Sequence, residues 1–191
     1  MAEDRQLVSD ALLGDDRAFE QLLSKYLTPV YNFISTLTRD RAVAEDLAQE
    51  TFIKVWKNLA RFDRKRNFKT WLFAIAKNTT YDFFKKKKSI PFSFFEDEEG
   101  QNRLDMVDAQ AIAPETLLEK EEKKEAVEGA LKTLPEPYQT LLALAYQEDF
   151  SLSEISQILG APYNTVKSRH QRALKLLKQA VAKGSAPESQ A

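Results

Sequence analysis

Apolar residues recur at helical spacing along most of this chain, and one long stretch without that spacing divides it. Residues 41–59 place a stripe of inward-facing side chains on one side of a helix: Val43, Leu47, Thr51, Phe52, Val55, Trp56 and Leu59. Residues 89–113 lose the period and contain Pro91, Gly100 and an acidic run. The sequence therefore predicts an all-α protein with two small helical domains joined by a flexible linker.

The first predicted domain covers residues 1–88. Helical spacing in residues 5–37 is interrupted at Gly14, after which Asp15 or Asp16 can cap a second helix. We expect Pro29 to bend or restart that second helix. Two further helices follow in residues 41–59 and 68–86. The linker is predicted at residues 89–113.

The second predicted domain covers residues 114–183, and residues 184–191 are predicted to form a disordered tail. A helix runs from Pro114 to about residue 131, and another covers residues 138–147. Ser151 and Glu154 then fit a capping box, and Gly160 can end that helix. A last helix covers residues 163–182. Two helices joined by a tight glycine turn predict a helix-turn-helix.

Composition excludes most enzyme classes. The chain has 191 residues, no cysteine, one histidine and five glycines. Thiolate metal sites, cysteine nucleophiles and glycine-rich phosphate loops are therefore excluded, and His170 falls on the apolar stripe of its helix, where a packed histidine is expected. We expect no catalytic residue, no metal and no cofactor. The acidic N-terminus and the lack of a long apolar run predict a cytoplasmic protein without membrane insertion.

The net charge of −1 hides an uneven distribution. Residues 1–95 carry +5, residues 96–128 carry −8, and residues 129–191 carry +2. Within the first block, residues 54–88 hold a local charge of +10. Two basic regions are thus balanced by an acidic connector, a pattern compatible with binding nucleic acid.

The last helix has a basic, hydrogen-bonding face opposite its apolar stripe. That face consists of Asn164, Lys167, Ser168, Gln171, Arg172, Lys175 and Lys178. Recognition helices present such side chains to base edges in the major groove, so DNA reading is favoured over a merely solvated helix face.

The outward face of the helix in residues 41–59 is open to two interpretations. It carries Glu45, Asp46, Gln49, Glu50, Ile53 and Lys57. Acidic groups near a helix N-terminus suit the helix dipole without any further role. Ile53, however, places an apolar side chain within a polar face, which a contact with a partner protein explains.

Residues 54–88 interleave aromatic side chains with their positive charge. Basic groups that follow phosphates beside rings that stack on bases are typical of single-strand binding. The loop at residues 61–68 could admit an extruded base. The alternative is that the rings belong to the core and that the lysines form a solvated helix end.

Four segments resemble the successive sequence blocks of the extracytoplasmic-function (ECF) sigma factors of bacterial RNA polymerase. They read GDDRAFEQLLSKY, AEDLAQETFIKVW, FKTWLFAIAKNTTYD and SLSEISQILGAPYNTVKSRHQRAL. The resemblance covers residues 5–88 and 114–182 in the family's order. It implies a first domain that binds core polymerase and melts the minus-ten promoter element, and a second that reads the minus-thirty-five element.

The resemblance also implies site residues. The core-polymerase contact would be made by Asp46, Gln49, Glu50 and Ile53. The minus-ten element would meet the specificity loop, Asn78 at the flipped base, and lysines on the strand backbone: Phe62, Asp63, Arg64, Lys65, Arg66, Asn67, Lys77, Asn78, Lys85, Lys86, Lys87 and Lys88. The minus-thirty-five element would be read by Thr165, Lys167, Ser168, Gln171 and Arg172. The chain departs from the family at His170 and Gln171, so the promoter sequence does not follow from the resemblance.

The implied partners are the bacterial RNA polymerase core, promoter DNA both as duplex and as melted single strand, and an anti-sigma factor, with no small-molecule substrate. The acidic linker would thread near the polymerase active-site and RNA-exit channels, either imitating a nucleic-acid strand or serving as a spacer. Two other functions stay open from the residues alone. One is a stand-alone helix-turn-helix repressor or activator, and the other is a metal-dependent nuclease that uses Glu45, Asp46 and Glu50.

Overall fold

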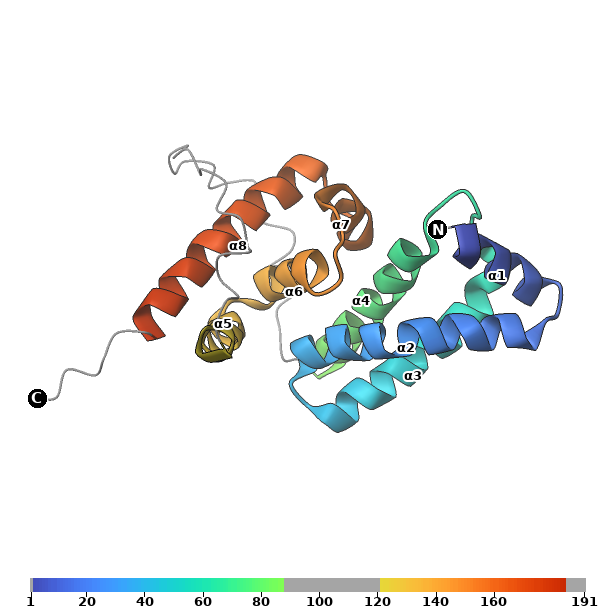
Figure 1. The fold of residues 1–191 in the computed structure, drawn as a ribbon, viewed down its shortest axis with the longest axis horizontal. Helices are drawn as coiled ribbons and strands as arrows, with labels where there is room; N and C mark the ends of the chain where they lie inside the picture. The colour runs from blue at the N-terminus through green and yellow to red at the C-terminus, as the bar shows by residue number, and fades with distance from the viewer. Residues whose placement is uncertain (1, 88–120, 185–191) are drawn as a thin grey trace, which may run out of the picture.

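The computed structural model describes residues 2–87 and 121–184, and these residues are helical apart from short turns and loops (Figure 1). The N-terminal domain contains α1 (Ala2–Leu12), α2 (Asp16–Thr38), α3 (Arg41–Asn58), the short η1 (Leu59–Arg61) and α4 (Phe68–Lys86). The C-terminal domain contains α5 (Glu121–Thr133), α6 (Glu136–Tyr146), α7 (Leu152–Leu159) and α8 (Tyr163–Gly184). The predicted all-α architecture is confirmed.

The predicted connections between the domains lie outside the described residues. This applies to the linker at residues 89–113, to the start of the second domain at residues 114–120, and to residues 185–191 of the predicted tail. The domain boundaries therefore stay predictions. Gly184, which we placed in the tail, is instead the last residue of α8.

Side-chain caps set the starts of the helices in the N-terminal domain. The carboxylate of Asp15 accepts a hydrogen bond from the main-chain N–H of Arg17 at the start of α2. In the same way, the Asp40 carboxylate accepts a main-chain N–H at the start of α3, and the side-chain oxygen of Asn67 accepts one at the start of α4. Each cap satisfies an N–H group that has no partner within the helix. The predicted break before Asp15 is confirmed.

Pro29 does not divide α2, which contradicts the predicted restart at this position. The helix continues from Asp16 to Thr38 with Pro29 inside it. Proline removes one intrahelical hydrogen bond. The helix persists because its apolar side packs into the core on both sides of the proline, through Leu22, Tyr26, Val30, Phe33 and Ile34.

The C-terminal domain has the predicted helix-turn-helix. The Ser151 hydroxyl accepts from the main-chain N–H of Glu154, and the Glu154 carboxylate accepts from the main-chain N–H of Ser151. Gly160 ends α7 in the left-handed region, with φ 66°. Ile155 of α7 and Val166 and Ala173 of α8 are fully buried, and the two helices pack against each other. This short turn fixes α8 relative to α7.

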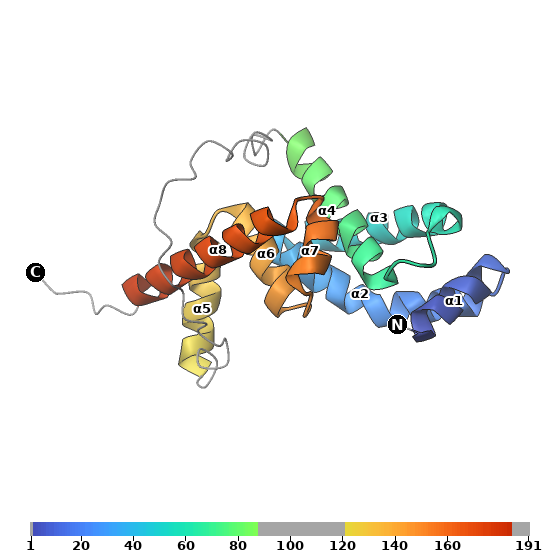
Figure 2. The same cartoon turned by 90° about the horizontal axis from the view of Figure 1, so that it is seen from above.

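The two domains touch through α4 and α2 of the first and α6 and α7 of the second, as Figure 2 shows from above. The ring of Phe73 in α4 packs against Phe150, which precedes α7, with 5.1 Å between centroids. The Tyr81 hydroxyl lies 3.0 Å from the Thr140 hydroxyl. These contacts between the domains could not be predicted from the sequence.

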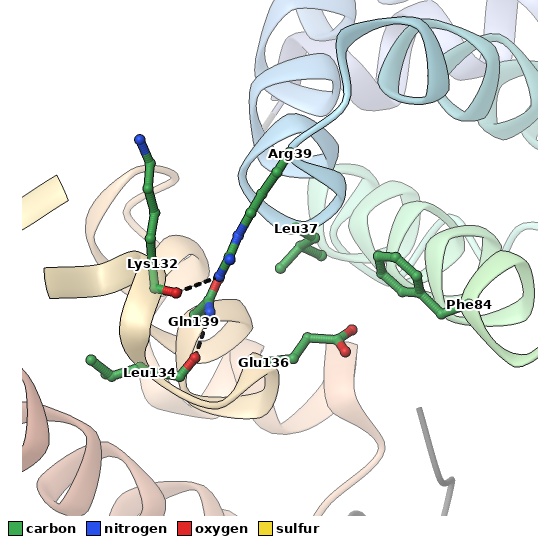
Figure 3. Close-up of a pocket in the computed structure, with 7 residues that line it drawn as sticks. All are labelled: Leu37, Arg39, Phe84, Lys132, Leu134, Glu136 and Gln139. Atoms are coloured by element: carbon green, nitrogen blue, oxygen red, sulfur yellow. Dashed lines mark hydrogen bonds between the residues drawn. The ribbon is translucent and has the colours of Figure 1, made fainter. Parts of the chain in front are cut away.

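A cavity of about 400 Å³ lies where the domains meet (Figure 3). The N-terminal domain lines it with Leu37, Arg39 and Phe84, and the C-terminal domain with Lys132, Leu134, Glu136 and Gln139. The Arg39 guanidinium spans the gap and donates to the main-chain oxygen of Lys132. One carboxylate oxygen of Glu136 is buried without a hydrogen-bond partner, and burial raises the pKa of Glu136 from 4.5 to about 7.

Because this pKa is raised in the folded chain, the contribution of Glu136 to stability is fully present below pH 4.5 and is lost as the pH rises through 7. We therefore expect Glu136→Gln to increase the free energy of unfolding at pH 8 by about 2 kcal/mol, with little effect at pH 5. Urea unfolding at the two pH values measures this difference. The exposed Glu128→Gln provides the control, and an identical pH dependence in both variants would contradict the assignment.

Candidate functional surfaces

The outer side of α3 presents the predicted polymerase-contact residues together. Asp46, Gln49, Glu50 and Ile53 are all exposed, and Ile53 keeps 54% of its surface in solvent. The Glu50 carboxylate pairs with Lys54 at 2.8 Å along the same helix. We call the surface formed by these four residues and Trp56 the α3 face.

Trp56 lies on the α3 face and not in the core, which corrects the sequence-based prediction. Its side chain is 48% exposed, and one side of the ring packs on Phe19 with 4.6 Å between centroids. Trp56 lies at the border of the apolar stripe, so periodicity alone assigned it inward. Its spacing of three residues from Ile53 was the available signal, because such residues are neighbours on a helix surface.

The loop before α4 is a tight turn organised by Asp63. The Asp63 carboxylate accepts from the main-chain N–H of Lys65 at 3.0 Å, and its main-chain oxygen accepts from the N–H of Arg66 at 2.9 Å. Such a turn is a usual role of aspartate. Arg64, Lys65 and Arg66 are exposed as a result, so three cations project from one turn.

Phe62 differs from the other predicted loop residues because it is only 6% exposed. Its ring packs against Phe68 at 5.7 Å and Trp71 at 4.8 Å between centroids. This placement does not fit a direct DNA contact. Phe62 instead anchors the loop to the core, which holds the three cations in place.

Asn67 has two roles at the end of the loop. Its side-chain oxygen accepts from the main-chain N–H of Thr70 and caps α4. Its side-chain nitrogen lies 3.4 Å from a carboxylate oxygen of Glu154 in the other domain. A residue predicted to contact DNA therefore also joins the loop to α7.

The remaining predicted minus-ten residues are spread along α4. Asn78 is exposed in the middle of the helix, and Lys85, Lys86 and Lys87 are exposed at its end. Lys88 lies outside the described residues. The helix has 19 residues, so the loop and the lysines lie about 28 Å apart. They form an elongated track and not a single cluster.

Lys77 is half-buried beside this track. Its ammonium lies 5.5 Å from the centre of the Tyr81 ring, and burial lowers its pKa while Asp82 acts in the opposite direction. A partly desolvated cation next to a ring is well suited to a phosphate, since less hydration has to be removed on binding.

The predicted reading residues lie along the exposed side of α8. Lys167 and Gln171 are exposed, whereas Thr165, Ser168 and Arg172 are half-buried. The Ser168 hydroxyl donates to the main-chain oxygen of Thr165 at 3.0 Å, so it is already engaged within the helix. Tyr163, 49% exposed at the start of the helix, joins this surface and was not predicted.

His170 packs as expected from its position on the apolar stripe. Its ring stacks on Tyr146, and its Nε2 lies 2.9 Å from the Tyr146 hydroxyl. Burial lowers the pKa of His170. The histidine therefore connects α8 to α6 through this stacked ring pair.

Among the described residues, no group of three or more potential metal-binding side chains comes together. Glu45 and Glu50, which the nuclease alternative requires, each pair with a basic residue of α3. No helix in the described ranges is long and apolar enough to cross a membrane.

Known protein families match both halves of the chain. Sigma-70 region 2 matches residues 22–90, and Sigma-70, region 4 matches residues 124–177. The ECF RNA polymerase sigma factor SigW of Bacillus subtilis is 34% identical over 170 residues, which cover 87% of this chain and 90% of that protein. The chain belongs to the ECF sigma factors. The RNA polymerase sigma-H factor of Pseudomonas aeruginosa is a further relative, 31% identical over 94% of each chain.

Solved structures agree with this assignment. The sigma factor RpoE of Bartonella quintana, crystallised with the anti-sigma factor NepR, is 27% identical with a TM-score of 0.63, over 86% of this chain and 96% of that one. CnrH, in complex with the cytosolic domain of CnrY, shares the fold with a TM-score of 0.69 and 23% identity, over 96% of this chain and 99% of that one. This ECF sigma factor thus has the two-domain fold of its relatives.

In this sigma factor, Asn67→Ala should lower the free energy of unfolding by about 1 kcal/mol, because it removes the cap of α4. Asn67→Ser should lower the free energy of unfolding much less, since its hydroxyl also accepts the N–H of Thr70 and adds no second negative charge beside Glu154. Urea unfolding measures both, with the exposed Lys65→Ala as control. Equal losses for Ala and Ser at position 67 would show that the cap contributes nothing.

Proposed function

We propose that the chain directs RNA polymerase to promoters through three surfaces, on α3, on the loop with α4, and on α8. The observation that carries the proposal is that the three predicted sets of residues lie on three different parts of the chain. Each set of residues that the family resemblance singled out lies mainly on the outside of its own helix, while the opposite sides form the cores. The three surfaces can therefore act together on one large complex.

The α3 face is proposed to bind the polymerase core. Ile53 and Trp56 form an exposed apolar pair next to the acidic and amide groups of Asp46, Gln49 and Glu50. Interfaces commonly concentrate their binding energy in a few such apolar and aromatic residues surrounded by polar ones. Trp56 extends the contact that the sequence predicted.

The loop and α4 are proposed to hold the melted minus-ten strand. Arg64, Lys65 and Arg66 would meet phosphates at one end, and Lys85–Lys87 at the other, with Asn78 between them for a base that has left the stack. Capture of unstacked bases contributes about 1 to 3 kcal/mol per base where a ring is available. Binding energy of this kind favours the open form of the promoter.

The helix α8 is proposed to read the minus-thirty-five duplex in the major groove. Lys167 and Gln171 are both exposed, and they are spaced four residues apart, so both point the same way. Thr165, Ser168 and Arg172 would support them from the same side.

In this proposal the chain carries out no covalent step, because RNA synthesis belongs to the polymerase. It would act where polymerase and promoters are found, in the cytoplasm. An anti-sigma factor is proposed as a further partner, supported by the relative solved in complex with one.

The first test is transcription with purified core polymerase on a promoter library. The wild-type chain should initiate from a defined subset of promoters, and Ile53→Asp or Trp56→Ala should weaken its affinity for core by about tenfold, a change of about 1.4 kcal/mol. The matched control is Leu27→Ala, an exposed apolar residue on α2. Tight binding to duplex DNA without any initiation would support a stand-alone regulator instead.

The second test distinguishes side chains of α8 that contact base edges from those that contact phosphates. Gln171→Ala should change which upstream sequences are preferred, with a cost of about 1 to 3 kcal/mol on the preferred base pair. Lys175 is an exposed lysine further along α8, and Lys175→Ala should weaken binding to all upstream sequences alike. If Gln171→Ala weakened binding to all upstream sequences equally, that side chain would contact phosphates and not base edges.

A further inference from the structure

The first helix, α1, has no part in the three proposed surfaces, and the match to Sigma-70 region 2 begins after it, at residue 22. α1 packs along the beginning of α2 (Figure 1), and it also packs against η1, which leads into the loop before α4. We call this loop, residues 62–67, the minus-ten loop. A helix outside the proposed contact surfaces therefore lies beside the loop that is proposed to meet the melted strand.

Asp4, in the first turn of α1, is a buried carboxylate with only 6% of its surface exposed. One of its oxygens accepts a hydrogen bond from the Lys25 ammonium at 2.7 Å, and the other accepts one from the Tyr26 hydroxyl at 3.0 Å. Removing a carboxylate from water is costly unless its oxygens find donors of this kind. Asp4 therefore attaches the start of α1 to two neighbouring residues of α2.

Tyr26 connects Asp4 to the start of α4. Its side chain is 6% exposed, and its ring lies 5.7 Å from the ring of Phe68 between centroids. Burial raises the pKa of Tyr26, and the charge of Asp4 acts in the same direction, so the hydroxyl keeps its proton and donates it to the hydrogen bond. The Tyr26 ring is thus held by α1 at its hydroxyl and by α4 along its body.

Two buried rings lie at the ends of the minus-ten loop. Phe62 is the first residue of the loop, and Phe68 is the first residue of α4. Their rings lie 5.7 Å apart between centroids, edge to face. The three exposed cations at residues 64–66 project from the turn between them. The position of these cations therefore depends on a pair of rings, one of which rests on Tyr26.

Resting on the proposed function, we propose that Asp4 is a positioning residue for recognition of the minus-ten element. Through Tyr26 and Phe68, its carboxylate fixes the minus-ten loop and the start of α4 in the orientation in which they meet the melted strand. Asp4 does not touch DNA, because it is buried. Selection of the minus-ten sequence then depends on α1, although no residue of α1 contacts the strand.

A small displacement at Phe68 is enough to change what the minus-ten loop binds. A protein interior is close-packed, so a shift of one buried ring is passed to its neighbours. The cations of the loop hold phosphates through charge-assisted hydrogen bonds, whose donor and acceptor atoms lie about 2.7 to 2.9 Å apart. A shift of about 1 Å therefore breaks such a contact.

Two substitutions of Asp4 separate its hydrogen bond to Tyr26 from its ion pair with Lys25. Asp4→Ala removes both. Asp4→Asn keeps an oxygen that accepts the Tyr26 hydroxyl, and it loses only the charge that pairs with Lys25, which still pairs with Glu3 at 2.8 Å. Tyr26→Phe removes the hydrogen bond from the other side and keeps the ring against Phe68.

The measurement is initiation by the holoenzyme, assembled from core polymerase and the full chain, on promoters with a fixed upstream element and a randomised minus-ten element. Selectivity is the ratio of initiation from the preferred minus-ten sequence to initiation from single-base variants of it. Asp4→Ala and Tyr26→Phe should lower this ratio about threefold to tenfold, as expected for residues that act through others. Asp4→Asn should restore it to near the wild-type value. A loss in Asp4→Asn equal to that in Asp4→Ala would overturn the proposal.

Val8→Ala controls for a loss of stability alone. Val8 lies one turn after Asp4 on α1 and is fully buried, so its truncation loosens the packing of the helix and leaves Asp4 and Tyr26 in place. Urea unfolding should show that Val8→Ala and Asp4→Ala both unfold more easily than the wild type. Only Asp4→Ala should lose minus-ten selectivity. Equal losses of selectivity in the two variants would overturn the proposal, because the stability of α1 would then explain both.

The double variant tests whether Asp4 acts through the Tyr26 hydroxyl. Asp4→Ala combined with Tyr26→Phe should lose no more selectivity than either substitution alone, since both remove the same hydrogen bond. Losses that multiply in the double variant would show that this route is wrong.

The upstream element provides a control within the same experiment. The preference of Asp4→Ala among minus-thirty-five sequences should equal that of the wild type, because α8 is proposed to read them. If Asp4→Ala keeps the minus-ten selectivity of an active wild type, the positioning role is wrong and the proposed function stands. If the wild type initiates from no promoter, the proposed function fails, and the positioning role fails with it.

Discussion

Burial of Phe73 from two directions is the constraint on which the arrangement of this molecule depends. The side chain is fully buried, with its ring 5.5 Å from Phe33 in its own domain and 5.1 Å from Phe150 in the other. Full burial of a phenylalanine stabilises by about 1.5 to 3 kcal/mol, and here both domains supply the surroundings. The positions of Lys69 and Tyr81, one turn before and two turns after Phe73, follow from this contact.

Most of the secondary structure could be predicted because its signals are local. The caps at Asp15 and Ser151 and the left-handed Gly160 act within a few residues of their own helix ends, so the sequence contains all that decides them. The exposed positions of Asp46, Gln49, Glu50 and Ile53 also followed from the helical period. The predicted restart of the helix at Pro29 was wrong because the cost of the proline is local, whereas the core contacts that offset it are not.

The parts of the site that escaped prediction depend on contacts between distant segments. The helical repeat of apolar residues assigns a residue to one side of a helix, but it does not determine how wide the buried stripe is. Trp56 lies at the edge of that stripe. Phe62 sits in a charged loop, and only the approach of Phe68 and Trp71 shows that it is buried. The pairing of Lys69 with Glu148 joins the two domains, and the sequence around each residue contains no sign of it.

Several contacts between the domains are single hydrogen bonds: Thr36 with Gln147, Asn67 with Glu154, and Tyr81 with Thr140. Contacts of this kind would not hold two separate proteins together at ordinary concentrations. On one chain, each domain meets the other at an effective concentration on the order of 1 mM, so weak contacts are enough to keep them docked. The covalent connection between the domains is therefore part of what keeps them docked, in addition to the contact residues themselves.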